Sequence, residues 1–148
     1  MTSISNDLIW ELTRANSSYL VKRKTAGGAQ FSTDPFSLDN TYSYKTSGVA
    51  NTKAVGVSLS DAGSIVLTTK KAGTFATPAK STITTTFKPY KANRAVYAAV
   101  AGITKGYRND LIPTAVSRAS ALLASKSSKK TYAKKLRGKK AKEFSELK

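Results

Sequence analysis

Clusters of lysine and arginine are the residues of this 148-residue chain best suited to do chemistry, and that chemistry is phosphate binding. Two clusters, Lys22-Arg23-Lys24 and Lys70-Lys71, each end a predicted strand. A denser one fills residues 124–148, which hold ten basic residues against two Glu. Lysine outnumbers arginine 19 to 6, and an ammonium group is a point charge that reads base edges poorly. The pattern therefore predicts contacts to a phosphate backbone rather than sequence readout.

The net charge of the whole chain is +17, from 25 Lys and Arg against 8 Asp and Glu. A field of this size attracts polyanions, and the self-repulsion of the cations is offset when an anion binds. Nucleic acid is the first candidate partner, and an anionic membrane surface is the second. Without residues 124–148 the chain still has 15 basic and 6 acidic residues, so the body is predicted to be basic too.

Aromatic residues lie beside several of the cations, namely Tyr90, Tyr107 and Tyr132. A tyrosine ring next to a cation can stack on an unpaired base, as aromatic side chains do in RNA-binding sites. Packing within the protein is at least as common a role for each ring taken alone. The single tryptophan, Trp10, is predicted to anchor a short N-terminal helix in the core, because large aromatic side chains dominate core burial.

The residue types needed for most enzymatic chemistry are missing from the sequence. There is no Cys and no His, which excludes Cys/His zinc sites and nucleophiles activated by histidine. The carboxylates are scattered, and the body pair Asp34 and Asp39 lies in turn-like sequence where hydrogen bonds to the backbone are expected. The sequence thus predicts no enzyme, no cofactor, no metal ion and no small-molecule substrate.

Neither a targeting segment nor a membrane span is predicted. Residues 1–20 contain Asp7 and Glu11 and no long apolar run, so they are unlike a signal peptide. The longest hydrophobic stretch, residues 95–103, is alanine-rich and too short to cross a bilayer. Because there is also no cysteine to form a disulfide, we expect a cytosolic or nuclear protein with no membrane partner.

The elements that must position these side chains follow from periodicity. Alternation of apolar and polar residues predicts a β-hairpin at residues 54–70 and single strands at 18–23, 41–46 and 82–87. Tyr42 and Tyr44 would share one face of the 41–46 strand. The loop after the first strand contains Gly27-Gly28, but it lacks the Gly-Lys-Ser/Thr of a phosphate-binding loop.

Helical spacing predicts a short helix capped by Ser5 or Asn6 and two helices after Pro89. The first of these two spans residues 93–104 and is capped by Gly106. The second runs from about Asp110, as the N-cap, to Ser125, and its apolar face comprises Leu111, Ala115, Val116, Ala119, Leu122 and Leu123.

Strands followed by helices predict the α+β class: a small antiparallel sheet with a short N-terminal helix and two C-terminal helices, then a basic tail. Residues 1–125 are predicted to form one α+β domain that binds RNA, and residues 126–148 the basic C-terminal tail. The tail offers too little apolar surface to fold alone in water.

Three blocks of sequence follow one another along the chain. They are Ser5-Asn6-Asp7-Leu8-Ile9-Trp10 with residues 14–23, Phe31-Ser32-Thr33-Asp34-Pro35 with residues 44–48 and 53–57, and Tyr107-Arg108-Asn109-Asp110-Leu111 with residues 118–122. In this order, and with the strand before Lys70-Lys71, they resemble the eukaryote-type ribosomal protein twenty-eight of the large ribosomal subunit. The chain departs from the usual family pattern at Asn109, where proline is common, and at Ile112 and Ser117, where basic residues are common.

The resemblance implies a structural constituent of the cytosolic large ribosomal subunit that binds ribosomal RNA, without catalysis or cofactor. It implies neighbouring ribosomal proteins as further partners, and a cytoplasmic location after nucleolar assembly. Matching motif positions put Lys22, Arg23, Lys70, Lys71, Tyr107, Arg108 and Arg118 near RNA. Other basic residues of the body and tail complete the predicted RNA-binding set: Lys24, Arg94, Lys105, Lys126, Lys129, Lys130, Lys134, Lys135, Arg137, Lys139 and Lys140.

Two alternative functions share the same charge pattern. A related domain opens a nucleolar assembly factor of the large subunit, but that factor is longer, contains cysteine and continues into acidic sequence. The Ala/Ser/Lys-rich end is also typical of chromatin-type nucleic-acid-binding proteins such as linker histones, whose tails are normally longer and richer in proline. Absence from translating ribosomes would favour the assembly factor, and release with nucleosomes would favour the chromatin protein.

Overall fold

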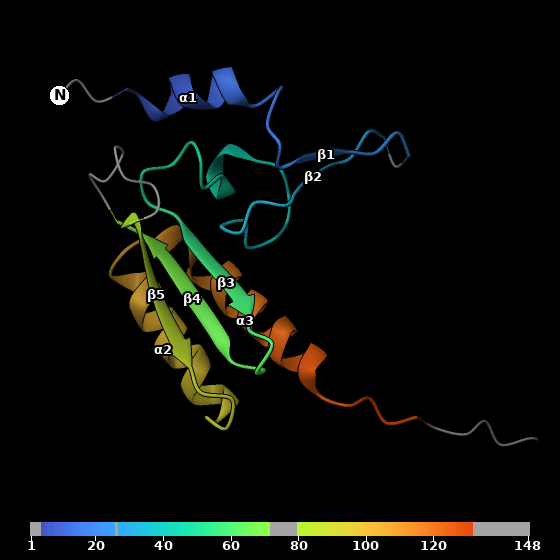
Figure 1. The fold of residues 1–148 in the computed structure, drawn as a ribbon, viewed down its shortest axis with the longest axis vertical. Coiled ribbons are helices and arrows are strands. Elements are labelled where there is room, and N and C mark those ends of the chain that lie inside the picture. Colours follow the sequence, from blue (N-terminus) through green and yellow to red (C-terminus); the bar gives the residue numbers. More distant parts are fainter. Residues whose placement is uncertain (1–3, 26, 72–79, 132–148) are drawn as a thin grey trace, which may run out of the picture.

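The computed structural model describes residues 4–25, 27–71 and 80–131, and Figure 1 shows how they are arranged. The helices of this described part are α1 (Asn6–Thr13), α2 (Asn93–Lys105) and α3 (Ile112–Lys126), with short 3-10 helices η1 (Tyr44–Thr46) and η3 (Asn109–Leu111). Its strands are β1 (Leu20–Lys22), β2 (Gln30–Ser32), β3 (Val55–Leu59), β4 (Ile65–Lys70) and β5 (Thr82–Phe87). This order of elements confirms the predicted α+β class.

Strands β3, β4 and β5 form a three-stranded antiparallel sheet in that order. β3 and β4 are the predicted hairpin, in which Val57 lies opposite Leu67. The turn between them is closed by a hydrogen bond of 2.8 Å from the Gly63 amide to the Ser60 carbonyl. Gly63 has a φ of 73°, a left-handed conformation that glycine adopts without a steric penalty.

Helices α2 and α3 pack against each other and cover one face of this sheet, behind it in Figure 1. Both layers contribute apolar side chains to the core: Val55, Val57, Ile65, Leu67, Phe87, Val96, Val100, Leu111, Ala115 and Ala119, joined by Leu38 from the segment before β3. The predicted apolar face of α3 is confirmed, because Val116, Leu122 and Leu123 also pack against this core. In α2 the innermost residue of the last turn is Thr104, whereas Ile103 of the predicted face is partly exposed.

The N-terminal region, residues 4–47, lies at the top of Figure 1, above the three-stranded sheet. Ser5 caps α1 by accepting a hydrogen bond of 3.2 Å from the Leu8 amide, as predicted. β1 and β2 pair with each other as a separate two-stranded antiparallel hairpin. The strand predicted near residues 18–23 therefore exists, but it belongs to this second sheet.

The prediction that Trp10 anchors α1 in the core is wrong, because Trp10 packs on two tyrosines outside the main core. Its ring centroid lies 5.2 Å from that of Tyr42 and 5.8 Å from that of Tyr44. Trp10 remains partly exposed, and so does every other residue of α1. A helix of eight residues is marginal in isolation, so α1 depends on these ring contacts to hold its position.

The predicted strand at residues 41–46 is wrong. Thr41 makes an isolated bridge to Phe31, and the chain then turns into η1. The hydroxyl groups of Ser43 and Thr46 lie 2.8 Å apart, and Thr46 also donates to the Thr41 carbonyl at 3.1 Å. Side-chain hydroxyls thus satisfy locally the groups that a strand would offer to a neighbour.

The predicted N-cap of α3 is also wrong. The Asp110 carboxylate binds Arg108 at 2.7 Å, and Leu111 takes the N-cap position without a side-chain hydrogen bond. Helix α3 begins at Ile112, and Pro113 in its first turn removes an amide that would have had no intrahelical partner.

Candidate nucleic-acid interface

Cationic and aromatic side chains meet at the end of the sheet where β5 turns into α2. Tyr90 in this turn is 78% exposed, and the Lys88 ammonium group lies 5.7 Å from the centroid of its ring. Lys91 lies 5.8 Å from the ring centroid of Phe87. These residues line a groove of about 380 Å³. We call Lys88, Tyr90, Lys91, Arg94 and Lys126 the Tyr90 cluster.

Lys126 ties the Tyr90 cluster to the rest of the fold. Its ammonium group donates to the Pro89 carbonyl at 3.3 Å and to the Gly63 carbonyl at 3.2 Å. The last turn of α3, the β3–β4 turn and the β5–α2 turn are therefore joined at one point. Of the predicted residues, Arg94 follows in the first turn of α2, and Lys129 and Lys130 continue from α3 with exposed side chains.

The electrostatics of this end favour an anion. The first turn of α2 has no acidic residue, and the positive end of the helix dipole adds to the charges of Lys88, Lys91 and Arg94. Exposed lysines also keep their side-chain freedom, which suits a diffuse phosphate backbone better than a fixed small ligand. The arrangement can bind phosphates beside a ring on which a base can stack.

At the other end of the sheet, the predicted residues Lys70 and Tyr107 are bound within the protein. The Tyr107 hydroxyl donates to the Lys70 carbonyl and accepts from the Ala54 amide at 3.1 Å. The Lys70 ammonium group donates to the carbonyls of Gly48 and Asn51 at 2.9 and 3.1 Å. Burial lowers the pKa of Lys70 and raises the pKa of the Tyr107 hydroxyl. The Tyr107 hydroxyl thus joins the segment after α2 to the start of β3 and the end of β4, and the Lys70 ammonium group joins the end of β4 to the segment before β3.

Arg108 also binds protein acceptors. Its guanidinium donates to the carbonyls of Lys45 and Lys53 at 3.1 Å each and forms an ion pair with Asp110 at 2.7 Å. The hydrogen bond from Arg108 lowers the pKa of the Asp110 carboxyl. Lys71 and Lys105 lie at the same end with exposed side chains. This end therefore combines structural cations with exposed ones.

Arg118, the remaining predicted residue of α3, is partly buried and lines a pocket of about 420 Å³ together with Asp34, Asn40 and Thr68. Its Nε atom is buried and has no hydrogen-bond partner among residues 4–25, 27–71 and 80–131. A buried guanidinium nitrogen without an acceptor is costly, so Arg118 is a strained position of the fold.

The predicted cluster at Lys22, Arg23 and Lys24 lies at the end of β1 with all three side chains exposed. The Arg23 guanidinium carbon lies 6.0 Å from the ring centroid of Phe31 on the paired strand. The cluster is separate from both ends of the main sheet. The predicted residues Lys134, Lys135, Arg137, Lys139 and Lys140, and Tyr132, lie outside the described residues.

The body carboxylates serve the turns, as predicted. Asp34 is buried and accepts hydrogen bonds from the amides of Phe36 and Gly48 at 2.9 and 2.7 Å. Asp39 accepts one from the Thr41 amide at 3.2 Å. Within the described part of the chain, no group of three Asp, Glu, Cys or His side chains is placed to hold a metal ion.

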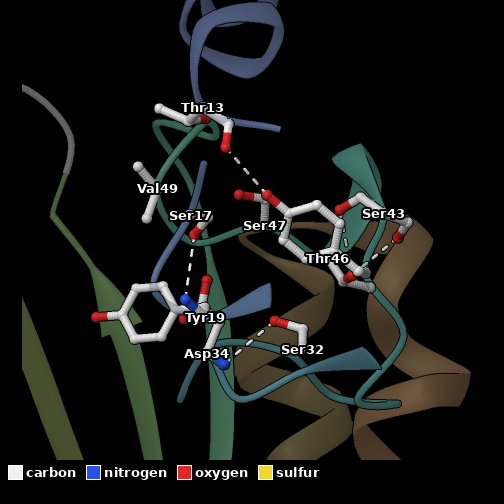
Figure 2. A pocket seen from close by; sticks show the side chains of 10 residues that line it. Thr13, Ser17, Tyr19, Ser32, Asp34, Ser43, Thr46, Ser47 and Val49 are labelled. Atoms are coloured by element: carbon white, nitrogen blue, oxygen red, sulfur yellow. Dashed lines mark hydrogen bonds between the residues drawn. The ribbon is translucent and has the colours of Figure 1, made fainter. Parts of the chain in front are cut away.

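A small polar cavity lies where the N-terminal region folds on itself, and Figure 2 shows its lining. The Tyr42 hydroxyl donates to the Thr13 carbonyl at 3.3 Å, and the Ser32 hydroxyl accepts from the Asp34 amide at 3.2 Å. The cavity measures about 10 Å³, which is room for roughly one water molecule. It is therefore too small for a ligand, and the hydrogen bonds around it hold the segments of the N-terminal region together. We call this group of hydrogen-bonded residues the polar joint.

Three residues of the Tyr90 cluster, Lys88, Tyr90 and Lys91, are absent from the predicted RNA-binding set, and of these the sequence pattern singles out only Tyr90, as a ring that can stack. The sequence does contain a feature that could have identified Lys88 and Lys91. They lie on either side of Pro89-Tyr90, and proline is typical of a turn at the surface. Among the described residues there is also no helix long and apolar enough to cross a membrane.

These features define a small, strongly basic α+β protein whose exposed cations surround aromatic rings and whose described carboxylates serve mainly turns and ion pairs. Residues 8–125 match the Ribosomal L28e protein family, and the chain belongs to that family. This confirms the resemblance of the three sequence blocks. Membership of a ribosomal protein family also confirms the prediction that the chain is not an enzyme.

Three relatives show how far the similarity extends. The chain is 38% identical over 133 residues to the large ribosomal subunit protein eL28 of Schizosaccharomyces pombe, an alignment that covers 88% of this chain and 99% of that protein. It is 37% identical over 83 residues to the protein of the same name from Caenorhabditis elegans, covering 56% of this chain and 63% of that protein. The Dictyostelium discoideum protein of that name is 34% identical over 84 residues, covering 57% of this chain and 61% of that protein.

Proposed function

We propose that this chain is a structural constituent of the large ribosomal subunit and that it binds ribosomal RNA through exposed lysine and arginine side chains. Membership of the Ribosomal L28e family supports the first part, since its relatives are named large ribosomal subunit proteins. The RNA contact rests on one observation, the exposed Tyr90 ring surrounded by cations in a chain of net charge +17. Neighbouring ribosomal proteins are the other proposed partners, and the proposed location is the cytoplasmic ribosome after nucleolar assembly.

The proposed phosphate contacts come from the exposed cations on three surfaces. They are Lys22, Arg23 and Lys24 on the β1 hairpin, Lys71 and Lys105 at one end of the main sheet, and Lys88, Lys91, Arg94, Lys126, Lys129 and Lys130 at the other. Lys70, Tyr107 and Arg108 would support RNA binding indirectly, because their polar groups already hold the fold. Arg118, which lines a pocket beside α3, and the predicted tail residues would add further contacts.

The proposal is tested by the salt dependence of binding to a fragment of large-subunit ribosomal RNA. If the full chain neutralises about eight phosphates, the logarithm of the binding constant falls against the logarithm of salt concentration with a slope of about −7. Filter binding over a series of KCl concentrations measures this slope. Binding that is absent, or that does not weaken with salt, would overturn the proposal.

A pair of variants tests the Tyr90 cluster within the same assay. Replacing both Lys88 and Lys91 with Gln removes two cations, so the magnitude of the slope should fall by about 2. The control replaces both with Arg, which keeps the charge and should keep the slope. If the two double variants behave alike, the cluster is not part of the RNA contact.

A further inference from the structure

A second aromatic groove lies between α1 and the β1–β2 hairpin, far along the chain from the Tyr90 cluster. It has a volume of about 330 Å³, and its lining is Trp10, Arg14, Ala15, Lys22, Gln30 and Tyr42. The Trp10 and Tyr42 rings lie 5.2 Å apart, centroid to centroid, and are tilted by 35°. We call this site the Trp10 groove.

The two rings of the Trp10 groove are held in place before any ligand arrives. The Tyr42 hydroxyl donates to the Thr13 carbonyl at 3.3 Å, and the Tyr42 amide donates to the Gln30 carbonyl at 3.4 Å. The Trp10 ring also packs on Tyr44, with 5.8 Å between the two ring centroids. Trp10 and Tyr42 are nevertheless only partly buried, so the groove presents a fixed aromatic surface that loses little freedom on binding.

The polar residues of the groove fit a nucleotide. Lys22 and Arg14 are exposed cations at its rim, and Gln30 brings an amide that can both donate and accept. Arg14 uses its Nε for an exposed ion pair of 3.0 Å with Glu11, which leaves its other guanidinium nitrogens available beside the groove. The tilted ring pair offers a surface for a base, the cations can bind its phosphate, and the Gln30 amide can bind the edge of the base.

We propose that the Trp10 groove binds one unpaired nucleotide of RNA, with its base stacked on the Trp10–Tyr42 pair and its phosphate held by Lys22 and Arg14. The inference rests on the proposed function, since it assumes that RNA is the partner. It adds a second site for an unpaired base, separate from the Tyr90 cluster, and this site is built from a pair of rings rather than a single exposed tyrosine. It also gives Trp10 a binding role in addition to anchoring α1.

Trp10 is the only tryptophan, so its fluorescence reports on this groove alone. Titration of the full chain with a short single-stranded oligoadenylate should quench Trp10 emission, because a stacked base contacts the indole directly. Inorganic polyphosphate of matched charge should compete for the same cations without quenching. Equal quenching by both polyanions would overturn the proposal.

A labelled oligoadenylate followed by anisotropy keeps this site distinguishable from the proposed function. Binding seen by anisotropy while Trp10 emission stays constant would contradict the Trp10 groove and leave RNA binding intact. Absence of oligoadenylate binding by both readouts would overturn the Trp10 groove, and the filter-binding assay with ribosomal RNA then decides the proposed function separately.

Three variants complete the test, each checked for an unchanged circular dichroism spectrum. Trp10→Ala should weaken oligoadenylate binding roughly tenfold to a hundredfold, whereas Trp10→Phe should retain most of it. Lys22→Glu should move the quenching midpoint to higher oligoadenylate concentration. The matched control Lys80→Glu changes an exposed lysine outside both aromatic sites and should leave the quenching midpoint unchanged. A Lys22→Glu chain that titrates like Lys80→Glu would contradict the assignment.

Discussion

The body of the molecule, residues 53–126, and the N-terminal region, residues 4–47, are stabilised by different forces. The body buries a continuous apolar core between its sheet and two helices, to which the N-terminal region contributes Leu38. The N-terminal region is held by stacked rings and by hydroxyl groups that bind carbonyls, such as Tyr42 to Thr13. Burial of apolar area stabilises strongly but hides side chains, whereas ring stacking at the surface stabilises less and leaves the rings accessible. The difference leaves the Trp10 and Tyr42 rings accessible within the N-terminal region, whereas in the body the exposed Tyr90 ring lies in the β5–α2 turn, outside the apolar core.

The largest difference in the free energy of unfolding is expected between a core leucine of the body and an exposed leucine of the N-terminal region. Leu67→Ala in β4 removes a side chain that is 1% exposed, and it should lower the free energy of unfolding by about 2–5 kcal/mol. Leu12→Ala in α1 removes one that is 70% exposed and should change it by less than about 0.5 kcal/mol. Urea unfolding of the full chain measures both. Equal losses would show that α1 contributes to the core as β4 does.

The next prediction concerns the place where the regions touch most closely. A β-carbon added to Gly56 in β3 would lie 2.5 Å from the Pro35 carbonyl oxygen, so Gly56→Ala must move backbone and should cost about 1–3 kcal/mol. The control Gly102→Ala places a methyl group in open space on α2 as far as the described residues extend. It should stabilise the chain by about 0.5–1 kcal/mol, because alanine favours helix. A neutral Gly56→Ala in urea unfolding would mean that the regions are not in rigid contact.

A third prediction isolates one hydroxyl of the N-terminal region. Tyr42→Phe keeps the ring but loses the hydrogen bond to the Thr13 carbonyl, and it should cost about 0.5–1.5 kcal/mol. Tyr90→Phe removes an exposed hydroxyl in the body and should change stability by less than about 0.5 kcal/mol. Thermal unfolding compares the pair. No difference between the two variants would show that the polar joint around Tyr42 does not stabilise the region.

The smallest expected effect is a pH dependence at the ion pair between Arg108 and Asp110. The pKa of Asp110 is lowered in the folded chain, so the pair stabilises the fold above the ordinary carboxyl pKa and loses that contribution as the pH falls through the lowered value. Because the carboxylate is 45% exposed, solvent screening limits the contribution to about 0.5 kcal/mol. Asp110→Asn should therefore lower stability at pH 7 by that amount and make no difference in strong acid.

Unfolding measured against pH checks this prediction, with Asp61→Asn in the β3–β4 turn as the control for a general loss of negative charge. A cost for Asp110→Asn that persists undiminished in strong acid would contradict the ion-pair explanation.

Local patterns predicted most of the fold. The hairpin at β3 and β4 follows from alternation and turn residues, and the face of α3 follows from helical spacing. The same kind of alternation at residues 41–46 predicted a strand that does not form, because Ser43 and Thr46 bind each other and the chain turns into η1. Periodicity does not record what a hydroxyl group will bind.

The candidate site was less predictable because its contacts join distant residues. Arg108 stood out as a cation, but its bonds to the Lys45 and Lys53 carbonyls depend on segments more than 50 residues away. The Trp10 groove likewise needs Tyr42 and Lys22 to meet α1. Charge and composition predicted the class of partner, whereas tertiary structure decides which cations and rings remain accessible to it.

A sucrose-gradient profile of lysate from cells that carry a tagged copy decides whether the chain is a stoichiometric constituent of the large ribosomal subunit. We predict that the tagged chain sediments with large subunits and polysomes and remains there after a moderate salt wash. Sedimentation with precursor particles alone would indicate an assembly factor, and recovery with chromatin or at the top of the gradient would contradict the assignment.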